Sequence, residues 1–245
     1  MAAGRPEDLT DGAGRLPVVL LPGLNTTPEV WSDVIARLPA DRDYVRLECP
    51  ALDTVEAVAD AVAAAAPARF HLVGYSFGGY VALAILERHA ERVESLAMVA
   101  SSAIADTEGQ RRYRDDCVAA AEAGRHEALN AASAPMSFND EAAIPPALMN
   151  RYLAMMRAYG AERFAAHSRA CARRPDRTQV LANTEVPVLF IGGEHDRVVS
   201  LRRQQESAAA AKADFRLLAG AGHQAPLEQP QALAEAFQDW WAQRR

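Results

Sequence analysis

Short apolar runs alternate with longer amphipathic stretches along most of the chain. Bounded by turn-forming residues, these runs predict β-strands at 18–21, 44–49, 70–73, 93–100, 186–191 and 214–218. Between several of them, apolar positions recur every three or four residues, which is typical of one helix face. This alternation predicts an α/β fold whose mostly parallel central sheet is flanked by helices on both faces.

The helices that follow individual strands have recognisable starts and stops. We expect helices at 30–38, 77–89 and 231–241, and another that Asp53 or Thr54 caps and that stops before Pro67. In each case the apolar positions lie along one stripe, so one face of the helix is suited to pack on the sheet.

The strand pattern disappears from about residue 104 to 183 and the segment reads as helical, broken by Pro145 and Pro146. This segment contains eleven arginines and ten acidic residues, a net charge of +1, whereas the remainder carries −7. We therefore predict one core domain made of residues 1–103 and 184–245, with residues 104–183 inserted as a helical cap.

Composition excludes several classes of protein. With 245 residues, half of them hydrophobic, the chain is long enough to bury the core of one large domain. The net charge of −6 lacks the dominant basic surface that nucleic-acid binding needs. Three scattered cysteines fit neither a disulfide framework nor a zinc site, so we expect a reducing, cytoplasmic location.

The N-terminal residues 1–15 lack the apolar core of a signal peptide, and the first apolar run, 16–21, is too short to span a bilayer. We expect a frayed leader and no membrane segment. The sequence leaves the oligomeric state open.

One serine stands between two glycines where the apolar run 70–73 changes into a helical pattern. Gly74-x-Ser76-x-Gly78 matches the strand–turn–helix motif that exposes a nucleophilic serine above a sheet edge. Because Ser76 precedes the helix at 77–89, the unpaired N–H groups and dipole of that helix favour negative charge beside it.

A serine hydroxyl needs a base, and that base needs a carboxylate to orient it. Asp196 and His223 follow two successive strands on glycine-containing loops, at the sheet edge where Ser76 is expected. Glu194 and Asp176 are nearby alternatives for the carboxylate. His223 is preferred to the five other histidines because of its loop placement.

The chain order Ser76, Asp196, His223 is that of the α/β-hydrolase triad. On these motifs, between about Leu16 and Trp240, the chain resembles the α/β-hydrolase superfamily and its small bacterial carboxylesterases related to the pimeloyl carrier-protein methyl ester esterase. The resemblance implies the α/β-hydrolase fold, with backbone N–H groups of Phe77 and Leu24 as oxyanion donors.

Two positions depart from the pattern of these relatives. Pro22 stands where they very often have histidine before the glycine, and the segment 48–53 lacks a Gly-x-Gly-x-Ser loop. The resemblance therefore implies the type of reaction more strongly than the substrate.

We expect a serine hydrolase that cleaves small carboxylic esters through an acyl-enzyme, without metal or other cofactor and without nucleic-acid or membrane partners. A thioesterase, lactonase, amidase, C–C bond hydrolase or perhydrolase would use the same triad, and the sequence does not separate them. The rival from another class is a non-enzymatic ligand-binding member of the fold.

Three features of the predicted cap have competing interpretations. An apolar series at helical spacing offers candidates for a lid, although packing between helices is the favoured interpretation. His167 could face the pocket, but helix packing is favoured for it as well. Its arginines would suit an anionic carrier protein or carboxylate substrate, but interspersed acids favour a solvated face. The apolar series is Leu148, Tyr152, Met155, Met156 and Tyr159, and the arginines are Arg111, Arg112, Arg114, Arg151 and Arg157.

Overall fold

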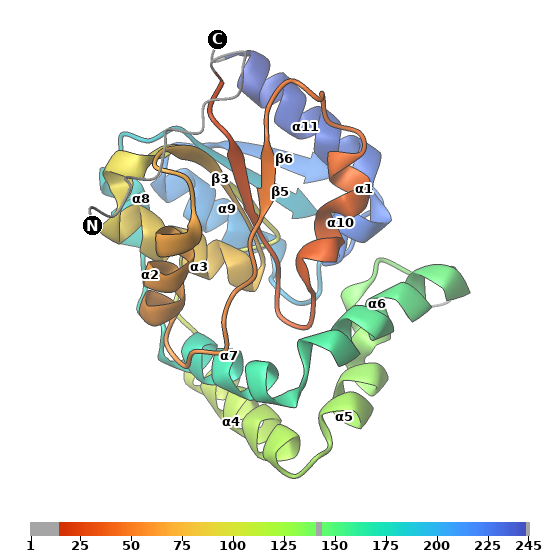
Figure 1. Ribbon diagram of the computed structural model, residues 1–245. Helices are drawn as coiled ribbons and strands as arrows, with labels where there is room; N and C mark the ends of the chain where they lie inside the picture. Colours follow the sequence, from red (N-terminus) through yellow and green to blue (C-terminus); the bar gives the residue numbers. More distant parts are fainter. Residues whose placement is uncertain (1–14, 141–143, 244–245) are drawn as a thin grey trace, which may run out of the picture.

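A six-stranded sheet forms the centre of the computed structural model, which describes residues 15–140 and 144–243 (Figure 1). All pairings are parallel, in the order β2-β1-β3-β4-β5-β6. Apart from Arg15, the expected leader lies outside the described residues. The strands are β1 (Val18–Leu21), β2 (Tyr44–Arg46), β3 (Phe70–Tyr75), β4 (Val93–Val99), β5 (Val188–Gly193) and β6 (Asp214–Leu218).

The six predicted strands are thus confirmed: β1 and β6 have the predicted ends, and the ends of the other four are shifted. β2 stops at Arg46 rather than at residue 49, because its pairing with β1 ends where Arg46 lies opposite Leu20. At its C-terminal end β5 runs two residues further than predicted. These residues, Gly192 and Gly193, pair with Leu217 and Leu218 of β6.

Helices cover both faces of the sheet (Figure 1). The predicted helix at 30–38 is instead a short 3-10 turn followed by one α-helical turn, and Thr54 rather than Asp53 caps α2. One face carries η1 (Pro28–Trp31), α1 (Ser32–Ile35), α10 (Ala225–Glu228) and α11 (Pro230–Ala242), and the other carries α2 (Val55–Ala65), α3 (Phe77–Arg88), α8 (Thr178–Asn183) and α9 (Leu201–Ala210).

Alternating side chains of the strands supply the two halves of the core. Val18 and Leu20 of β1 pack with Trp31 and the α11 side, whereas Val19 and Leu21 pack with the α3 side. Successive residues of a strand point to opposite faces, so continuous apolar runs are what a sheet covered on both faces requires.

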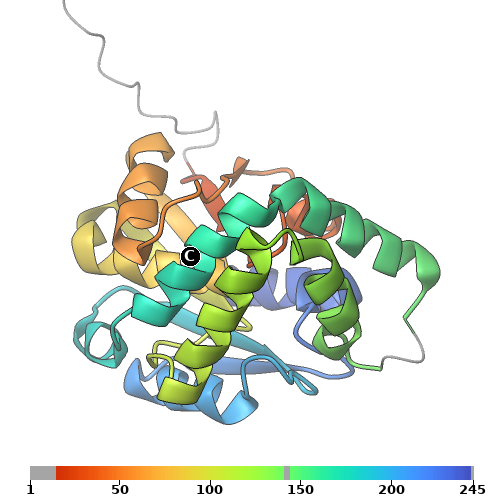
Figure 2. The ribbon, with the colours of Figure 1, turned by 90° about the horizontal axis from the view of Figure 1, so that it is seen from below.

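Between β4 and β5 the chain leaves the sheet and forms a separate group of helices at one end of it (Figures 1 and 2). Thr107 and Gln110 form a capping box at the start of α4. We call this set the α4–α7 group; it comprises α4 (Glu108–Glu122), α5 (His126–Ser133), η3 (Ala134–Ser137), α6 (Pro146–Tyr159) and α7 (Ala161–Arg173).

No helix within residues 15–140 and 144–243 combines the length and the apolar character needed to cross a bilayer.

The chain turns from β3 into α3 with strand and helix in backbone contact. A Cβ atom on Gly74 would lie 2.5 Å from the carbonyl oxygen of Gly78 and 2.6 Å from Cα of Gly79. A Cβ atom on Gly78 would lie 2.6 Å from the carbonyl oxygen of Leu21 in β1. Any side chain here would push α3 away from the sheet, so the glycines are a steric requirement of the turn.

We predict that Gly74→Ala lowers the free energy of unfolding by about 1–3 kcal/mol, because the added methyl group meets backbone atoms that cannot rotate away. Gly109→Ala is the matched control, since nothing lies within 4 Å of the position of its Cβ atom. This control should match or exceed the wild type by up to about 1 kcal/mol. Urea denaturation measures both, and equal stabilities would contradict the steric explanation.

Candidate active site

Ser76 occupies a strained turn between β3 and α3. Its φ of 50° and ψ of −112° lie in a region that residues with a side chain rarely adopt. The Ser76 N–H donates to the carbonyl of Val99, and the Ser101 hydroxyl donates to the carbonyl of Ser76 at 2.8 Å. These bonds to the end of β4 hold the turn in place.

The three side chains predicted as a triad are brought together at one edge of the sheet. Nε2 of His223 lies 2.9 Å from Oγ of Ser76, and its Nδ1 lies 2.9 Å from Oδ2 of Asp196. All three residues are buried. Because a carboxylate can only accept, Nδ1 carries the hydrogen, and Nε2 is left to accept the serine hydroxyl. In this tautomer the imidazole is ready to take a proton from Ser76.

Three further donors surround the carboxylate of Asp196. Oδ1 accepts the N–H groups of Val198 at 2.8 Å and Val199 at 2.9 Å. Oδ2 also accepts Nε2 of Gln204 at 3.0 Å. Hydrogen bonds of this kind stabilise an ionised carboxylate and fix its orientation toward the imidazole.

The loops that carry Asp196 and His223 run against each other. The N–H of His195 donates to the carbonyl of Ala221 at 2.9 Å, and a Cβ atom on Gly193 would lie 2.1 Å from the carbonyl oxygen of Gly222. Glycine at position 193 therefore allows the contact that brings acid and base within hydrogen-bonding distance.

The α4–α7 group supports the base from its other side. The N–H of His223 donates to the carbonyl of Ser137 in η3 at 2.9 Å. The side chain of Gln224 bonds to both the Ser137 hydroxyl and the Tyr75 hydroxyl. Burial raises the pKa of Tyr75 well above its usual value, so this phenol remains a neutral donor.

The alternative carboxylates have other partners. Glu194 accepts the N–H of Gly220, and Asp176 accepts the N–H groups of Thr178 and Ala105. The structure brings neither of them to His223 among the described hydrogen bonds.

Leu24 and Phe77, the predicted oxyanion donors, both line the pocket beside Ser76. Within the described part of the chain, no hydrogen bond uses the N–H of either residue. The loop around Leu24 is held by Thr26, whose N–H and hydroxyl both donate to the carbonyl of Gly23. Asn25, with a φ of 59°, bonds to two residues of α5: its Nδ2 donates to Oδ1 of Asn130, and its Oδ1 accepts from Nε2 of His126.

His167 of α7 is fully buried and stacks on Phe77, with ring centroids 4.2 Å apart. Its Nε2 donates to the carbonyl of Pro50 at 2.7 Å, and the Tyr159 hydroxyl bonds to its Nδ1. Burial lowers the pKa of His167 to about 4, so the ring is neutral at physiological pH. It supports the residue after Ser76 and does not contact the serine.

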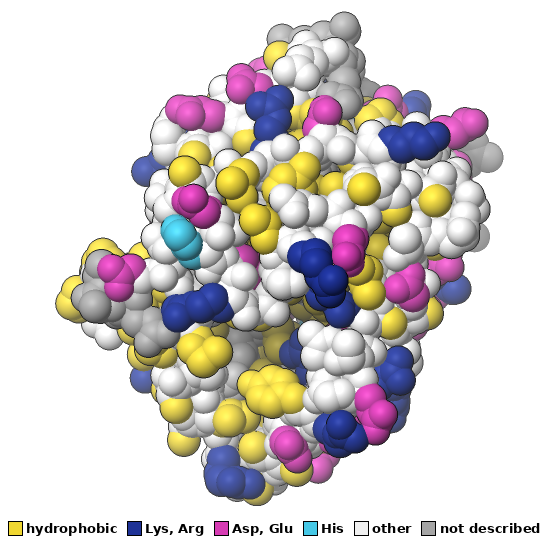
Figure 3. Space-filling model, turned by 180° about the vertical axis from the view of Figure 1, so that it is seen from behind, with side chains coloured by type: hydrophobic (Ala, Val, Ile, Leu, Met, Phe, Trp, Pro, Cys, Tyr) yellow, Lys and Arg dark blue, Asp and Glu magenta, His cyan; other side chains and the backbone are white. Residues whose placement is uncertain are grey.

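A cavity of about 400 Å³ opens beside Ser76 between the core and the α4–α7 group. Seen from behind, the molecule is hollowed between these two parts, with hydrophobic side chains around the opening (Figure 3). Cys117 and Cys171 line it, and burial raises the pKa of both thiols. Because the thiolate is the reactive form, both cysteines are kept in their less reactive thiol form.

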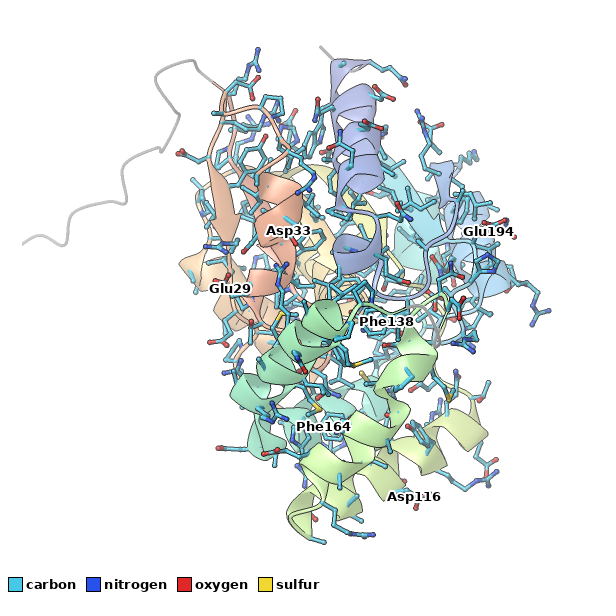
Figure 4. The ribbon with its side chains drawn as sticks, turned by 90° about the vertical axis from the view of Figure 1, so that its right-hand side faces the viewer. Glu29, Asp33, Asp116, Phe138, Phe164 and Glu194 are labelled. Atoms are coloured by element: carbon cyan, nitrogen blue, oxygen red, sulfur yellow. The ribbon has the colours of Figure 1, made fainter. Side chains whose placement is uncertain are left out.

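The apolar series on α6 serves mainly for packing. Tyr152 packs edge-on against Phe138 with ring centroids 5.6 Å apart, and Met155 joins the same core. Figure 4 shows Phe138 at the boundary between core and α4–α7 group, and Phe164 within that group. Of the five lid candidates, Tyr152 is the member that also lines the cavity.

Three of the five arginines singled out from the sequence match the expected solvated face. Arg111 is exposed, and Arg112 and Arg157 form exposed pairs with Glu108 and Glu127. Arg151 instead joins α6 to Asp33 of α1, which faces the α4–α7 group in Figure 4. Arg114 differs from the expectation, because it lines the cavity.

Sequence reasoning missed the supporting residues. Ser137 and the Asn25–Asn130 pair act across long sequence separations, with Asn25 Nδ2 lying 2.6 Å from Asn130 Oδ1, whereas Gln204 reaches Asp196 from the helix that follows it. No motif marks these positions. No group of three or more His, Cys, Asp or Glu side chains within the described ranges is arranged to hold a metal ion.

We predict that lowering the pH from 7 to 5 destabilises the wild type more than His167→Gln, by on the order of 1–2 kcal/mol. The folded pKa of about 4 lies below the usual 6.5, so the unfolded chain binds this proton first as the pH falls. Stability is therefore lost between about pH 6.5 and 4. Urea denaturation at both pH values measures the difference, and parallel losses in the two proteins would contradict the assignment.

The chain is similar in sequence to a known family and to several known proteins. The family model described as the alpha/beta hydrolase family matches residues 18–236. The pimeloyl-[acyl-carrier protein] methyl ester esterase of Pectobacterium carotovorum is 39% identical over 101 residues, covering 38% of this chain and 40% of the relative. The Neisseria meningitidis protein of the same name is 35% identical, covering 35% and 30%. These matches span less than half the length of the curated relatives.

Solved structures share the fold along nearly the whole chain. An esterase from Thermogutta terrifontis has a TM-score of 0.84 at 22% identity, covering 94% of this chain and 90% of its own. The enol-lactonase of Burkholderia xenovorans LB400 has a TM-score of 0.81 at 22% identity, covering 95% and 94%. With a family model matching most of its length, the chain belongs to the alpha/beta hydrolase family.

Proposed function

We propose that the protein is a serine hydrolase that cleaves carboxylic esters through an acyl-enzyme intermediate. The observation that carries the proposal is the unbroken hydrogen-bonded row from Ser76 through His223 to Asp196, at the wall of a cavity. The names of the partial relatives, which are methyl ester esterases, agree with this reaction.

Ser76 Oγ attacks the ester carbonyl carbon while its proton passes to Nε2 of His223. The tetrahedral intermediate places its negative oxygen at the N–H groups of Leu24 and Phe77, which no described hydrogen bond occupies. Asp196 stabilises the imidazolium through Nδ1. His223 then protonates the departing alkoxide, which leaves as the alcohol.

Water completes the cycle. His223 removes a proton from a water molecule, the hydroxide attacks the acyl-enzyme carbonyl, and collapse of the second tetrahedral intermediate returns the proton to Ser76 and releases the acid. Both halves use the same base and the same oxyanion donors, so no additional group is needed.

We further propose that residues 104–183 act as a cap over a core formed by residues 1–103 and 184–245. In support, α4, α5, η3, α6 and α7 all supply residues to the wall of the cavity that Ser76 lines. α8, near the end of the segment, packs with α3 and α9 and so returns the chain to the core. Two exposed arginines of this segment, Arg112 and Arg157, are paired with glutamates, and neither pair supports a surface for an anionic carrier protein.

Labelling with a fluorophosphonate tests the nucleophile. The wild type should be labelled covalently and should release a burst of p-nitrophenol from a short-chain ester, whereas Ser76→Ala should do neither because the attacking oxygen is gone. An unlabelled wild type would favour a non-enzymatic ligand-binding protein. Labelling of a folded Ser76→Ala protein would remove Ser76 from the mechanism.

Replacing the acid tests the role of the row. Asp196→Asn should lower kcat by about 10³- to 10⁴-fold, because the amide no longer fixes the imidazole tautomer or stabilises its charge. Glu194→Gln is the control, since Glu194 lies at the outer edge of the core in Figure 4 and is half-exposed. Steady-state kinetics should leave this control within about twofold of the wild type; equal losses in both variants would refute the assignment.

A further inference from the structure

The cavity beside Ser76 carries an excess of positive charge. Its charged lining residues, apart from His223, are four arginines and one aspartate, Asp106. Guanidinium groups remain charged at all physiological pH values. A cavity lined this way favours a ligand with a negative charge. A neutral aliphatic ester would have no group that could pair with the positive charge of the arginines.

Asp106, Arg114 and Arg174 form a cluster within this wall. Oδ1 of Asp106 lies 2.8 Å from Arg174 Nη2, and its Oδ2 lies 3.4 Å from Nε of Arg114. Burial alone would raise the pKa of Asp106, but the hydrogen bonds and charges of the two arginines hold it below its usual value. Two cations thus face one ionised carboxylate, and the cluster keeps one unbalanced positive charge.

The guanidinium of Arg174 is bonded to groups of the protein itself. Its terminal nitrogens donate to the carbonyls of Cys171 and Ile104 as well as to Asp106, and its guanidinium lies 3.9 Å from the ring centroid of Tyr80. Its side chain is 3% exposed. This arginine therefore forms the back of the cluster and is held rigidly.

Arg114 makes its described hydrogen bond, to Asp106, through Nε. Within the described ranges no hydrogen bond involves its two terminal nitrogens, and its side chain is 20% exposed where it lines the cavity. The planar guanidinium fork matches the two oxygens of a carboxylate. On the same helix, Asp116 lies on the outer side, away from the core (Figure 4), so Arg114 is on the face of α4 directed to the cavity.

The cluster lies close to the reacting serine. Tyr80 lies in the first turn of α3, which begins directly after Ser76, so its backbone is about 6 Å further along the helix axis, and both residues line the same cavity. Arg174 covers the Tyr80 ring. Phe77, Phe164 and Cys117 supply apolar surface to the same cavity. A short aliphatic chain would thus connect an ester at Ser76 with an anion at Arg114.

We infer that the cavity binds esters that carry a carboxylate a short aliphatic chain away from the scissile carbonyl, and that Arg114 receives this carboxylate. The inference rests on the proposed esterase function. It names the substrate class of the same site and makes Arg114 a binding residue that selects for charge.

The test compares charged and neutral partners of equal length. Monomethyl glutarate and monomethyl adipate carry the carboxylate on the acyl side, and the acetate ester of a five-carbon hydroxy acid carries it on the alcohol side. Each is compared with its terminal amide by kcat/KM. We expect the wild type to prefer the acid over the amide by about tenfold or more in at least one series, and the preferred series identifies the side.

Arg114→Gln should lower this acid-to-amide ratio by about tenfold or more, because the fork and its charge are removed. Arg112→Gln is the matched control: it removes the same charge two residues away on α4, where Arg112 is exposed and paired with Glu108, and it should leave the ratio unchanged. A wild-type ratio near one in every series overturns the inference even if Arg114→Gln does not fold. Equal ratios in folded Arg114→Gln and wild type also overturn it.

Two further measurements separate this inference from the proposed function. Hydrolysis of p-nitrophenyl acetate by the wild type, together with ratios near one, would sink the inference alone. Absence of hydrolysis of every ester, including p-nitrophenyl acetate, would sink the proposed function. Titration calorimetry of Ser76→Ala with monomethyl adipate and its amide tests the subsite without chemistry: tighter binding of the acid supports it, and equal binding contradicts it.

Discussion

At the junction of β3 and α3, backbone meets backbone with no side chain between, and the geometry around Ser76 depends on this close approach. Gly74 and Gly78 bring the helix against both β3 and β1, so the N-terminus of α3 stands directly beside the loop of Leu24. The strained φ of Ser76 is the result of this crossing, held by bonds to the end of β4. Any loosening here would shift the serine and the N–H of Phe77 together.

A second set of contacts holds His223 from both sides. The loops of Asp196 and His223 meet through Gly193, while η3 holds the backbone of His223 through Ser137. The core carries Ser76, Asp196 and His223, and the α4–α7 group supplies part of the support. The position of the imidazole therefore depends on both parts of the molecule being packed together.

Strands and motifs were predictable from local pattern, because buried parallel strands are continuous apolar runs and the elbow needs glycines at fixed positions. The shorter β2 and the broken helix after Pro28 were not, since pairing and 3-10 geometry depend on neighbours. The order of Ser76, Asp196 and His223 indicated a shared edge, but only coordinates supply the distances.

The direction in which the side chains of polar helices point was the feature that the sequence predicted least well. Arg112 and Arg114 lie two residues apart on α4, and the sequence around them is rich in charge. One pairs with Glu108 in solvent and the other lines the cavity. Nothing local separates them, because the face that α4 turns inward is set by its packing with α7. The same reason hid Gln204 and Asn130.

The stacking of His167 on Phe77 constrains how a ligand reaches the serine. Hinging α7 away from α3 would unstack these rings and break the bond from His167 to the carbonyl of Pro50. A ligand that entered by this route would therefore reach Ser76 only after Phe77, the next residue, had lost its stacking partner. The cavity beside Ser76 is already open, as the hollow in Figure 3 shows, so a ligand that enters there would not require α7 to move away from α3.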